Sequence, residues 1–307
     1  MKGRVGVGVI GAGLQGELHA ASYSELQNAE LLAVCDINEE RAKEVAERYG
    51  AERWYTDVKE CLKHPGLEAV SVATPDFAHK EPVITALRAG KHVLCEKPLA
   101  ISVKDAEEMV RVAGERGLIL MAGFENRFSP PFVQAYNSIK SGEIGEPMMA
   151  YFRLSDTIDV PLRMIKWAGK TDPVFFLLSH VVDLIRWLFN SEVERVFARG
   201  IKRVLKARGI DVYDVLQASL RLKSGAIATL ETSWILPPTL PNVFDFYCEI
   251  VGSKGCIYIN PAIGGIKKFT SERYEHPDMI RFVRLPVGFT VGFVKSMCEH
   301  FIRCVLK

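Results

Sequence analysis

The feature that most constrains the fold of this chain is a glycine pattern directly after an apolar run near the N-terminus. The run Val5–Ile10 predicts a β-strand, and Gly11-Ala12-Gly13-Leu14-Gln15-Gly16 follows it and opens a helical segment. In such a strand–turn–helix unit the first glycine permits a tight turn, the second lets the backbone approach a pyrophosphate, and the third lets helix and strand pack closely. The pattern predicts a dinucleotide-binding turn, and a glycine-rich turn without a ligand is the alternative.

The residues around this turn alternate short β-rich runs with amphipathic helical runs, which is typical of a doubly wound parallel sheet. Helix starts are marked by the capping residues Asn38, Asp57 and Ser102, and helix ends by Gly90 and Gly117. We therefore predict an α/β Rossmann domain that binds NAD(P) over residues 1–125. Its strands are expected at 4–10, 30–35, 68–73, 91–95 and 118–123, with a weaker one at 53–55.

The second half of the chain shows a different pattern of predicted elements, with more strands and fewer helices. Ser129-Pro130-Pro131 interrupts the pattern, one helix is expected at 132–141, and hairpin turns are indicated at 223–225 and 252–255. This predicts an α+β domain over 126–307 with a large, mainly antiparallel open sheet that serves substrate binding and oligomerisation. Its strands are expected at 147–156, 193–204, 212–223, 226–236, 244–251 and 255–260, with weaker ones near 266–270 and 280–285.

Composition excludes several classes of protein. Apolar residues make up 48% and charged residues 25% of the 307, and the formal net charge of +2 argues against a dedicated nucleic-acid surface. The longest apolar stretch, 174–189, is interrupted by charged residues, so no membrane helix or membrane partner is expected. Seven cysteines without a C-x-x-C pair indicate reduced thiols in a cytoplasmic protein, and no metal site is predicted. The helical run 293–307 lacks a stop signal, which is consistent with a truncated C-terminus.

The end of the second predicted strand carries the residues that would bind the adenosine ribose. Asp36 falls 20 residues after Gly16, where a carboxylate accepts hydrogen bonds from ribose hydroxyls, and Ile37 is its neighbour in the predicted cofactor site. A 2′-phosphate would meet a negative charge there, which favours NAD over NADP, although Arg41 lies near enough to soften the preference. The alternative is a turn or cap role for Asp36, for which Asn38 is the better residue.

Two further segments follow predicted strands at the carboxyl edge of the sheet, where ligands collect in such folds. Ala73-Thr74-Pro75 would let the dinucleotide pass close, and His79 is either a substrate or cofactor contact or a local capping residue. Glu96-Lys97-Pro98 follows the fifth strand, and a cis Lys97–Pro98 bond is one way to aim the ammonium group at a nicotinamide. Lys97 is the candidate for proton exchange with a substrate hydroxyl, and a surface lysine paired with Glu96 is the alternative.

The strings GVIGAGLQGELHA, CDINEERAKEVAERYG and VATPDFAHKEPVITALRAGKHVLCEKPLA resemble the cofactor domain of the glucose-fructose oxidoreductase / inositol dehydrogenase family (Gfo/Idh/MocA). The resemblance covers residues 5–128, including Gly123-Phe124 and Arg127-Phe128. It implies a Rossmann domain, a second domain whose open sheet makes oligomer contacts, and hydride transfer between NAD or NADP and sugars, polyols or related compounds. It also implies that Lys97 is catalytic and that Glu96 and Arg127 join the cofactor site.

In the second half the resemblance rests on Ser179–Leu184, on a predicted helix. It implies that His180 is a catalytic acid or base, with an aspartate four residues earlier, one helical turn away. This chain has Phe176 at that position, so the carboxylate that would orient the imidazole is missing. The alternative for His180 is a helix histidine packed near Trp187. Asp183 is expected to orient His180, to cap local structure or to pair with Arg186.

These observations predict an NAD(P)-dependent oxidoreductase that moves a hydride between nicotinamide and a sugar, inositol, polyol or related hydroxyl or carbonyl compound. A homodimer or homotetramer formed through the C-terminal sheet is expected. One rival is a catalytically drifted dinucleotide-binding sensor or regulatory protein, for which Phe176 is the best support. A second rival is a methyltransferase, but that function offers no reason for Lys97 at the fifth strand.

Overall fold

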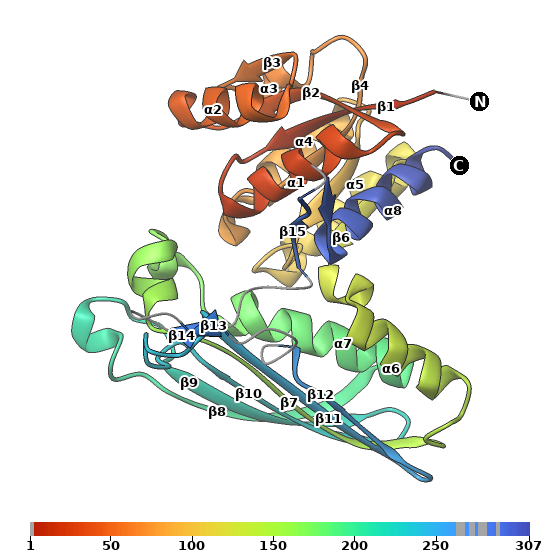
Figure 1. The fold of residues 1–307 in the computed structure, drawn as a ribbon, viewed down its shortest axis with the longest axis vertical. Coiled ribbons are helices and arrows are strands. Elements are labelled where there is room, and N and C mark those ends of the chain that lie inside the picture. The colour runs from red at the N-terminus through yellow and green to blue at the C-terminus, as the bar shows by residue number, and fades with distance from the viewer. Residues whose placement is uncertain (1–2, 262–267, 270–273, 276–280, 287–288) are drawn as a thin grey trace. The chain divides into compact units, whose positions relative to one another are not determined.

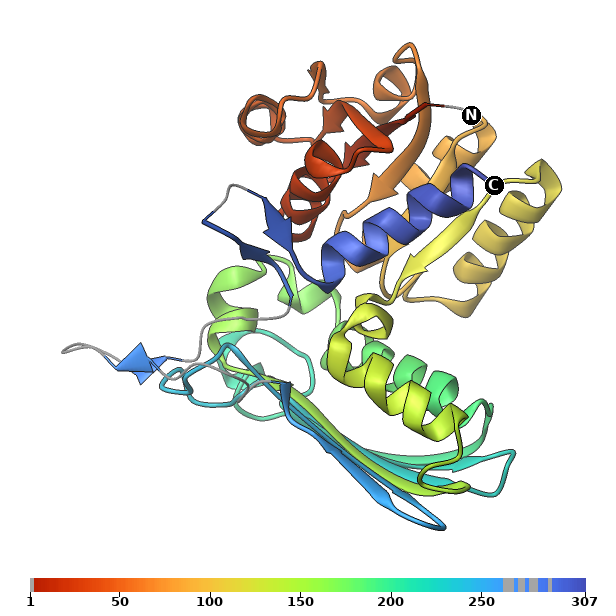
Figure 2. The ribbon, with the colours of Figure 1, turned by 45° about the vertical axis from the view of Figure 1, so that its right-hand side comes forward.

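The computed structural model describes residues 3–261, 268–269, 274–275, 281–286 and 289–307. The chain divides into two compact units, one made of residues 1–125 with 281–307 and the other of residues 126–280. We expected residues 281–307 to belong to the second domain, and this differs from the structure. The helix α8 (Phe293–Val305) packs on α1 (Leu14–Glu25) of the first unit, as both ribbon views show (Figure 1 and Figure 2).

The first unit is built on a six-stranded sheet in the order β3-β2-β1-β4-β5-β6, and all its strands are parallel. This is the doubly wound order in which the direction of winding reverses between β1 and β4, and ligands bind at that point outside the carboxyl ends of the strands. Its strands are β1 (Val5–Ile10), β2 (Ala29–Cys35), β3 (Arg53–Tyr55), β4 (Leu67–Val72), β5 (His92–Glu96) and β6 (Leu120–Gly123). Its other helices are α2 (Glu39–Tyr49), α3 (Val58–Cys61), α4 (Lys80–Arg88) and α5 (Val103–Arg116).

The predicted helix caps of the first unit are confirmed. Asn38 accepts a hydrogen bond from the N–H of Arg41 at 3.1 Å, and Asp57 accepts one from the N–H of Glu60 at 3.0 Å. Ser102 caps α5, which ends at Gly117 in the left-handed conformation. These local signals fix where the helices begin and end, and the buried strands β1, β4 and β5 between them fill the core.

The second unit holds a mixed six-stranded sheet in the order β12-β11-β7-β10-β9-β8, in which only the β7–β10 pair is parallel. The predicted hairpins at 223–225 and 252–255 are the β9–β10 and β11–β12 turns. Its main elements are α6 (Pro130–Lys140), β7 (Pro147–Asp156), α7 (Ser179–Phe189), β8 (Val193–Ile201), β9 (Val215–Leu222), β10 (Ile227–Ser233), β11 (Phe244–Gly252) and β12 (Cys256–Ile259). Short helices lie at η2 (Glu125–Phe128), η3 (Val160–Met164), η4 (Ala168–Lys170), η5 (Val174–Leu178) and η6 (Lys206–Arg208), and η1 (Asp76–Ala78) lies in the first unit.

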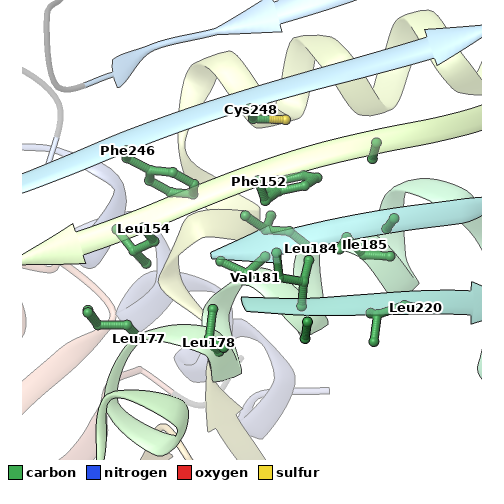
Figure 3. Close-up of a cluster of buried hydrophobic side chains, with 14 of the residues drawn as sticks. Phe152, Leu154, Leu177, Leu178, Val181, Leu184, Ile185, Leu220, Phe246 and Cys248 are labelled. Carbon is green, nitrogen blue, oxygen red and sulfur yellow. The ribbon is translucent and has the colours of Figure 1, made fainter. Parts of the chain in front are cut away.

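The helices α6 and α7 cover one face of this sheet (Figure 2). Strand β9 alternates buried and exposed residues, with Leu216, Ala218 and Leu220 turned toward the helices. Figure 3 shows the core that results, in which side chains of β7 and β11 meet Val181 and Leu184 of α7. The apolar face of α7 therefore fixes the helix that carries His180 against the sheet.

The strand expected at 193–204 is shorter than the sequence suggested. Strand β8 ends at Ile201, because the buried carboxylate of Asp214 accepts hydrogen bonds from the N–H groups of three successive residues, Arg203, Val204 and Leu205, and holds them in a turn. The strands expected near 266–270 and 280–285 are described only as β13 (Lys268–Phe269) and β15 (Val283–Arg284), and residues 266–267, 270 and 280 lie outside the described residues. The short strands β14 (Tyr274–Glu275) and β16 (Thr290–Val291) pair with them. Within the described ranges, no helix is long and apolar enough to cross a membrane.

The C-terminal segment is attached to α1 through one carboxylate. Glu25 accepts hydrogen bonds from the N–H and hydroxyl of Thr290 at 2.7 and 2.8 Å and from the ammonium of Lys295 at 2.8 Å. Burial acts to raise the pKa of Glu25, but the Lys295 and Thr290 hydrogen bonds outweigh it and leave the pKa lowered. The charged form of Glu25 therefore stabilises the folded state.

We predict that Glu25→Gln lowers the free energy of unfolding by about 2 kcal/mol, because charge-assisted hydrogen bonds are lost. Because the folded-state pKa is lowered, the stabilisation is complete above the pKa of the unfolded carboxyl. It disappears as the pH falls through the folded-state pKa, so the difference from wild type should shrink in acid. Urea unfolding at several pH values measures this. Glu30→Gln is the control, since Glu30 lies 3.8 Å from Arg4 in a pair whose side chains are both 48% exposed. Equal free energies of unfolding for Glu25→Gln and wild type at neutral pH would contradict the stabilising role of the Glu25 contacts.

Candidate functional site

The glycine turn lies between β1 and α1. Its three glycines differ in whether the surrounding backbone leaves room for a side chain. Gly11 has φ +91°, and a Cβ there would lie 2.7 Å from the backbone of Ala73 and Thr74. A Cβ on Gly16 would overlap the carbonyl oxygen of Gly11. Gly13 is exposed, and a Cβ built on it would have no described neighbour within 4 Å. The fold itself thus requires Gly11 and Gly16, whereas Gly13 leaves room at the start of a helix, where backbone N–H groups favour an anion.

Asp36 is held between this turn and the next helix. One carboxylate oxygen accepts a hydrogen bond from the N–H of Ala12 at 2.7 Å, and the other accepts one from the N–H of Asn38 at 2.9 Å. Asn38, not Asp36, caps α2. Ile37 is 95% exposed and Leu14 is 65% exposed, so two large apolar side chains flank the carboxylate and the turn in solvent. The arrangement suits a ligand with a flat apolar part and two neighbouring hydroxyls.

Arg41 is the residue that would have to receive a 2′-phosphate. Its Nε donates to the carbonyl oxygen of Ala12 at 2.7 Å, and its guanidinium pairs with Glu17 and with Glu44. The cation is thus neutralised by two carboxylates and directed into the turn. This geometry strengthens the preference for a ribose without a 2′-phosphate.

The segment after β4 places Ala73-Thr74-Pro75 next to the glycine turn, since the N–H of Ala73 donates to the carbonyl oxygen of Ile10 at 2.8 Å. His79 is only 1% exposed. Its Nδ1 lies 2.8 Å from the carbonyl oxygen of Pro98, and its Nε2 lies 2.9 Å from that of Thr74. Both ring nitrogens are therefore engaged with the protein, and the ring links this segment to the one after β5. The ring makes no cap hydrogen bond to α4, so this structural link is a role that neither expectation for His79 named.

Glu96 is the last residue of β5 and Lys97 follows it, and the Lys97–Pro98 peptide bond is cis. Glu96 is buried, and one of its oxygens lies 3.0 Å from Nε2 of His19 and 3.0 Å from Nε2 of Gln15. Its other oxygen accepts the backbone N–H of Lys97 at 3.2 Å. Burial acts to raise the pKa of Glu96, but His19, the Lys97 ammonium and Gln15 together lower it. Lys97 is half-buried beside this charge.

A second buried acid, Glu125, lies on the other side of Gln15. The Gln15 amide donates to Glu125 at 2.8 Å, and Arg281 bonds both to Glu125 at 3.2 Å and to the oxygen of Gln15 at 2.5 Å. Burial and the neighbouring Glu96 raise the pKa of Glu125, although Arg281 and Lys97 oppose this. The two carboxyl groups near Lys97 thus have pKa values displaced in opposite directions, an arrangement common at sites of proton transfer.

Sequence reasoning did not select His19, Glu125 or Arg281. Glu125 lies two residues after the end of β6 at the carboxyl edge of the sheet, and that position was the signal that could have identified it. Arg281 is 156 residues away from Glu125, and no local pattern indicates its return to the first unit. Within the described residues, no group of three or more His, Cys, Asp or Glu side chains is placed to hold a metal ion.

In the second unit, His180 is the second residue of α7 and is 8% exposed. Its Nδ1 lies 3.1 Å from Nδ2 of Asn126. Asp183 pairs with Arg127 through two hydrogen bonds of 2.8 and 2.6 Å, and not with Arg186. Arg127, predicted as a cofactor residue, thus makes its strongest described contact inside the second unit, while Arg186 pairs with Glu192. The Trp187 ring stacks on Tyr136 with centroids 4.5 Å apart.

Phe176 replaces the expected aspartate with an aromatic contact. It lies in η5, a π-helical turn before α7, and its ring meets Trp167 at 6.0 Å and the fully buried Trp234 at 5.5 Å between centroids. The nearby Asp172 accepts backbone N–H groups of Val174 and Tyr213, and burial raises its pKa. Asp172 therefore links the chain before η5 to Tyr213, and the aromatic cluster occupies the turn before His180.

Two family models match the chain. One, described as the oxidoreductase family with an NAD-binding Rossmann fold, matches residues 5–124, and the other, the GFO/IDH/MocA C-terminal domain, matches residues 132–258. Together they span both halves of the sequence, including the second half, where the motif resemblance was thin.

The relatives carry dehydrogenase names. Myo-inositol 2-dehydrogenase of Thermotoga maritima is 33% identical over 82% of this chain and 74% of its own length. Scyllo-inositol 2-dehydrogenase (NAD(+)) of Bacillus subtilis is 31% identical over 99% of this chain and 87% of its own length. The crystal structure of a probable dehydrogenase from Thermotoga maritima superimposes with a TM-score of 0.78, covering 98% of this chain and 88% of that one at 27% identity.

Proposed function

The chain belongs to the Gfo/Idh/MocA family of oxidoreductases, and from this premise we propose that its substrate is an inositol or a closely related cyclic polyol. It is an NAD-dependent oxidoreductase that acts on CH–OH groups. Two relatives named for dehydrogenation of inositol at position 2, at 31% and 33% identity, support the polyol. The observation that carries the chemistry is Lys97 at the end of β5, half-buried beside one charged and one pKa-raised carboxyl group.

Most residues of the proposed cofactor site belong to the first unit. The turn Gly11–Gly16 would receive the pyrophosphate at the start of α1, and the fixed carboxylate of Asp36 would accept the ribose hydroxyls. The remaining proposed cofactor residues are Ile37, Ala73, Thr74, Pro75, Glu96, Lys97 and Arg127, with His79 holding their segments in place. NAD, when bound, supplies the nicotinamide carbon that takes up the hydride and returns it in the reverse reaction.

We assign Lys97 the proton transfer. Oxidation of an alcohol removes a hydride from carbon and a proton from oxygen, and the Lys97 amine accepts that proton. In the reverse reaction the ammonium returns the proton to the carbonyl oxygen. Glu96 positions Lys97 through its backbone N–H, and the Glu96 charge stabilises the ammonium form after the proton has moved. His180 is the proposed second acid–base group.

Two other interpretations lose their support. The NAD-binding family model leaves no basis for a methyltransferase. The sensor interpretation relied on Phe176, yet the relatives that cover most of this chain are dehydrogenases, and Lys97 and His180 are both present.

We predict that Lys97→Met lowers kcat for inositol oxidation by roughly 10²-fold, the scale of a lost general acid–base group, with NADH affinity nearly unchanged. Stopped-flow absorbance gives the rate, and nucleotide fluorescence gives the affinity. Lys91→Met is the matched control, because Lys91 lies at the opposite, amino end of β5 and bonds the carbonyl oxygen of Leu67. Wild-type turnover by Lys97→Met would refute the assignment.

We further propose that copies of the chain associate through the uncovered face of the second unit's sheet. Among the described residues no helix covers the face opposite α6 and α7, and Phe197 and Ile227 are 62% and 53% exposed there. Tyr151 and Tyr247 also lie on this face, with Arg153 over the Tyr247 ring, and tyrosine and arginine are enriched in interfaces. Exposed apolar and aromatic side chains gathered among polar residues on one face are typical of a protein–protein interaction site.

Sedimentation equilibrium tests this association. The wild type should be a dimer or tetramer, and Phe197→Asp with Ile227→Asp should be a folded monomer, because two charges would be buried in the contact. Val110→Asp, at an exposed apolar position of α5 in the first unit, should leave the oligomer intact. A monomeric wild type would rule the interface out. A cytoplasmic location is also proposed, since all seven cysteines are free thiols.

A further inference from the structure

One side chain of the glycine turn is held by three contacts within the first unit. Gln15 is the second residue of α1, and its amide nitrogen donates to Glu96 at 3.0 Å and to Glu125 at 2.8 Å. Its amide oxygen accepts a hydrogen bond from Nη2 of Arg281 at 2.5 Å. Rotating the amide by half a turn would set its oxygen against the charged carboxylate of Glu96, so the three contacts fix a single orientation.

Arg281 completes this arrangement from the C-terminal part of the chain. It belongs to the same compact unit as Gln15, although 266 residues separate the two in sequence. Its Nε also donates to Glu125 at 3.2 Å, so one guanidinium contacts both the turn residue and an acid that the turn residue contacts. The Arg281 side chain is 40% exposed and that of Glu125 is 7% exposed, so the guanidinium joins a buried acid to the surface.

The charges around this amide explain why a cation is needed there. Burial acts to raise the pKa of Glu96, but His19 and the other groups around it leave that pKa lowered. Burial raises the pKa of Glu125, and the charge of Arg281 is the strongest influence that opposes this. Without Arg281, the turn that would receive a pyrophosphate would lie beside a buried acid that lacks its main compensating charge.

The C-terminal segment that carries Arg281 is also bonded to the opposite end of α1. Glu25, the last residue of that helix, accepts hydrogen bonds from Thr290 and Lys295. Between these two attachments α8 packs on α1 with its buried apolar side chains. The helix that begins at the glycine turn is therefore held at both ends by the C-terminal segment, and Arg281 is its contact with the turn.

We propose that Arg281 is a positioning residue for the cofactor. By holding the Gln15 amide and compensating Glu125, it keeps the first turn of α1 ready for the pyrophosphate, so that NAD binding and attachment of the C-terminal segment stabilise each other. Such coupling is reciprocal, so a contact that favours NAD binding is itself stabilised when NAD binds. This deepens the proposed function and rests on its placement of the pyrophosphate at the glycine turn.

Binding of the cofactor and its fragments to the full chain measures the first consequence, by nucleotide fluorescence for NADH and by calorimetry for ADP-ribose and adenosine. Arg281→Met should raise the dissociation constants of NADH and ADP-ribose roughly 10-fold, the scale of a typical coupling between two sites. The dissociation constant of adenosine should not change, because adenosine lacks the pyrophosphate and its ribose partner Asp36 is held by Ala12 and Asn38.

Two further variants separate this role from general destabilisation. Arg281→Lys keeps the charge beside Glu125 and should bind NADH more tightly than Arg281→Met. Arg303→Met is the matched control and should bind NADH as the wild type does, since Arg303 is 67% exposed in the same segment and pairs with Glu299 of its own helix. An NADH dissociation constant unchanged by Arg281→Met, an equal rise for adenosine, or no recovery in Arg281→Lys would overturn the proposal.

Hydrogen–deuterium exchange read by mass spectrometry measures the reciprocal consequence. NADH should slow exchange in α8 by a larger factor than in α5, which carries none of the proposed cofactor residues and reports stabilisation of the unit as a whole. In Arg281→Met this excess protection of α8 should disappear. Equal protection of α8 and α5 in the wild type would overturn the proposal.

These measurements need no turnover, so they are independent of the substrate. A wild type that shows both effects but oxidises no polyol would refute the proposed function alone. Polyol oxidation by a wild type whose NADH affinity does not depend on Arg281 would refute the present proposal alone.

Discussion

The buried carboxylate of Glu96 is the interaction on which the rest of the first unit depends. Removing a carboxylate from water is unfavourable unless hydrogen bonds and opposite charge compensate it. Glu96 obtains this compensation from His19 and Gln15 on α1 and from the backbone N–H of Lys97. The same carboxylate therefore holds the glycine-turn helix against β5 and fixes the lysine that follows the strand. Gly123 leaves room for it, since a Cβ there would lie 3.2 Å from a Glu96 oxygen.

Gln15 extends this network to the C-terminal segment. Its amide donates to both Glu96 and Glu125, and its oxygen accepts from Arg281. Glu25 attaches the same segment at the other end of α1. One helix thus connects the dinucleotide turn, the proposed catalytic lysine and a part of the chain more than 260 residues away. The opposite pKa displacements of Glu96 and Glu125 follow from their unequal shares of positive charge.

The elements with local signals could be predicted from the sequence, and contacts between distant segments could not. The glycine turn, the caps at Asn38 and Asp57 and the two hairpins depend on neighbouring residues, so short patterns reveal them. The return of α8 to the first unit depends on contacts at long separation, namely the apolar side chains that α8 buries and the polar contacts of Glu25. The Arg127–Asp183 pair was missed for a related reason, because several acids and cations lie within a turn of His180 and only packing decides between them. The sequence showed the loss of the aspartate at Phe176, but only the structure placed Asn126 beside the imidazole.

The proposed function requires this chain to transfer a hydride from a polyol carbon to NAD⁺. Transfer of a deuterium label measures that step directly. The wild-type protein is incubated with NAD⁺ and inositol deuterated at the ring carbons, and the NADH formed is analysed by mass spectrometry and proton NMR. The account predicts NADH with one deuterium at nicotinamide C4, because the hydride moves without exchange with water. NADH without the label, or no NADH from any inositol isomer, would contradict it.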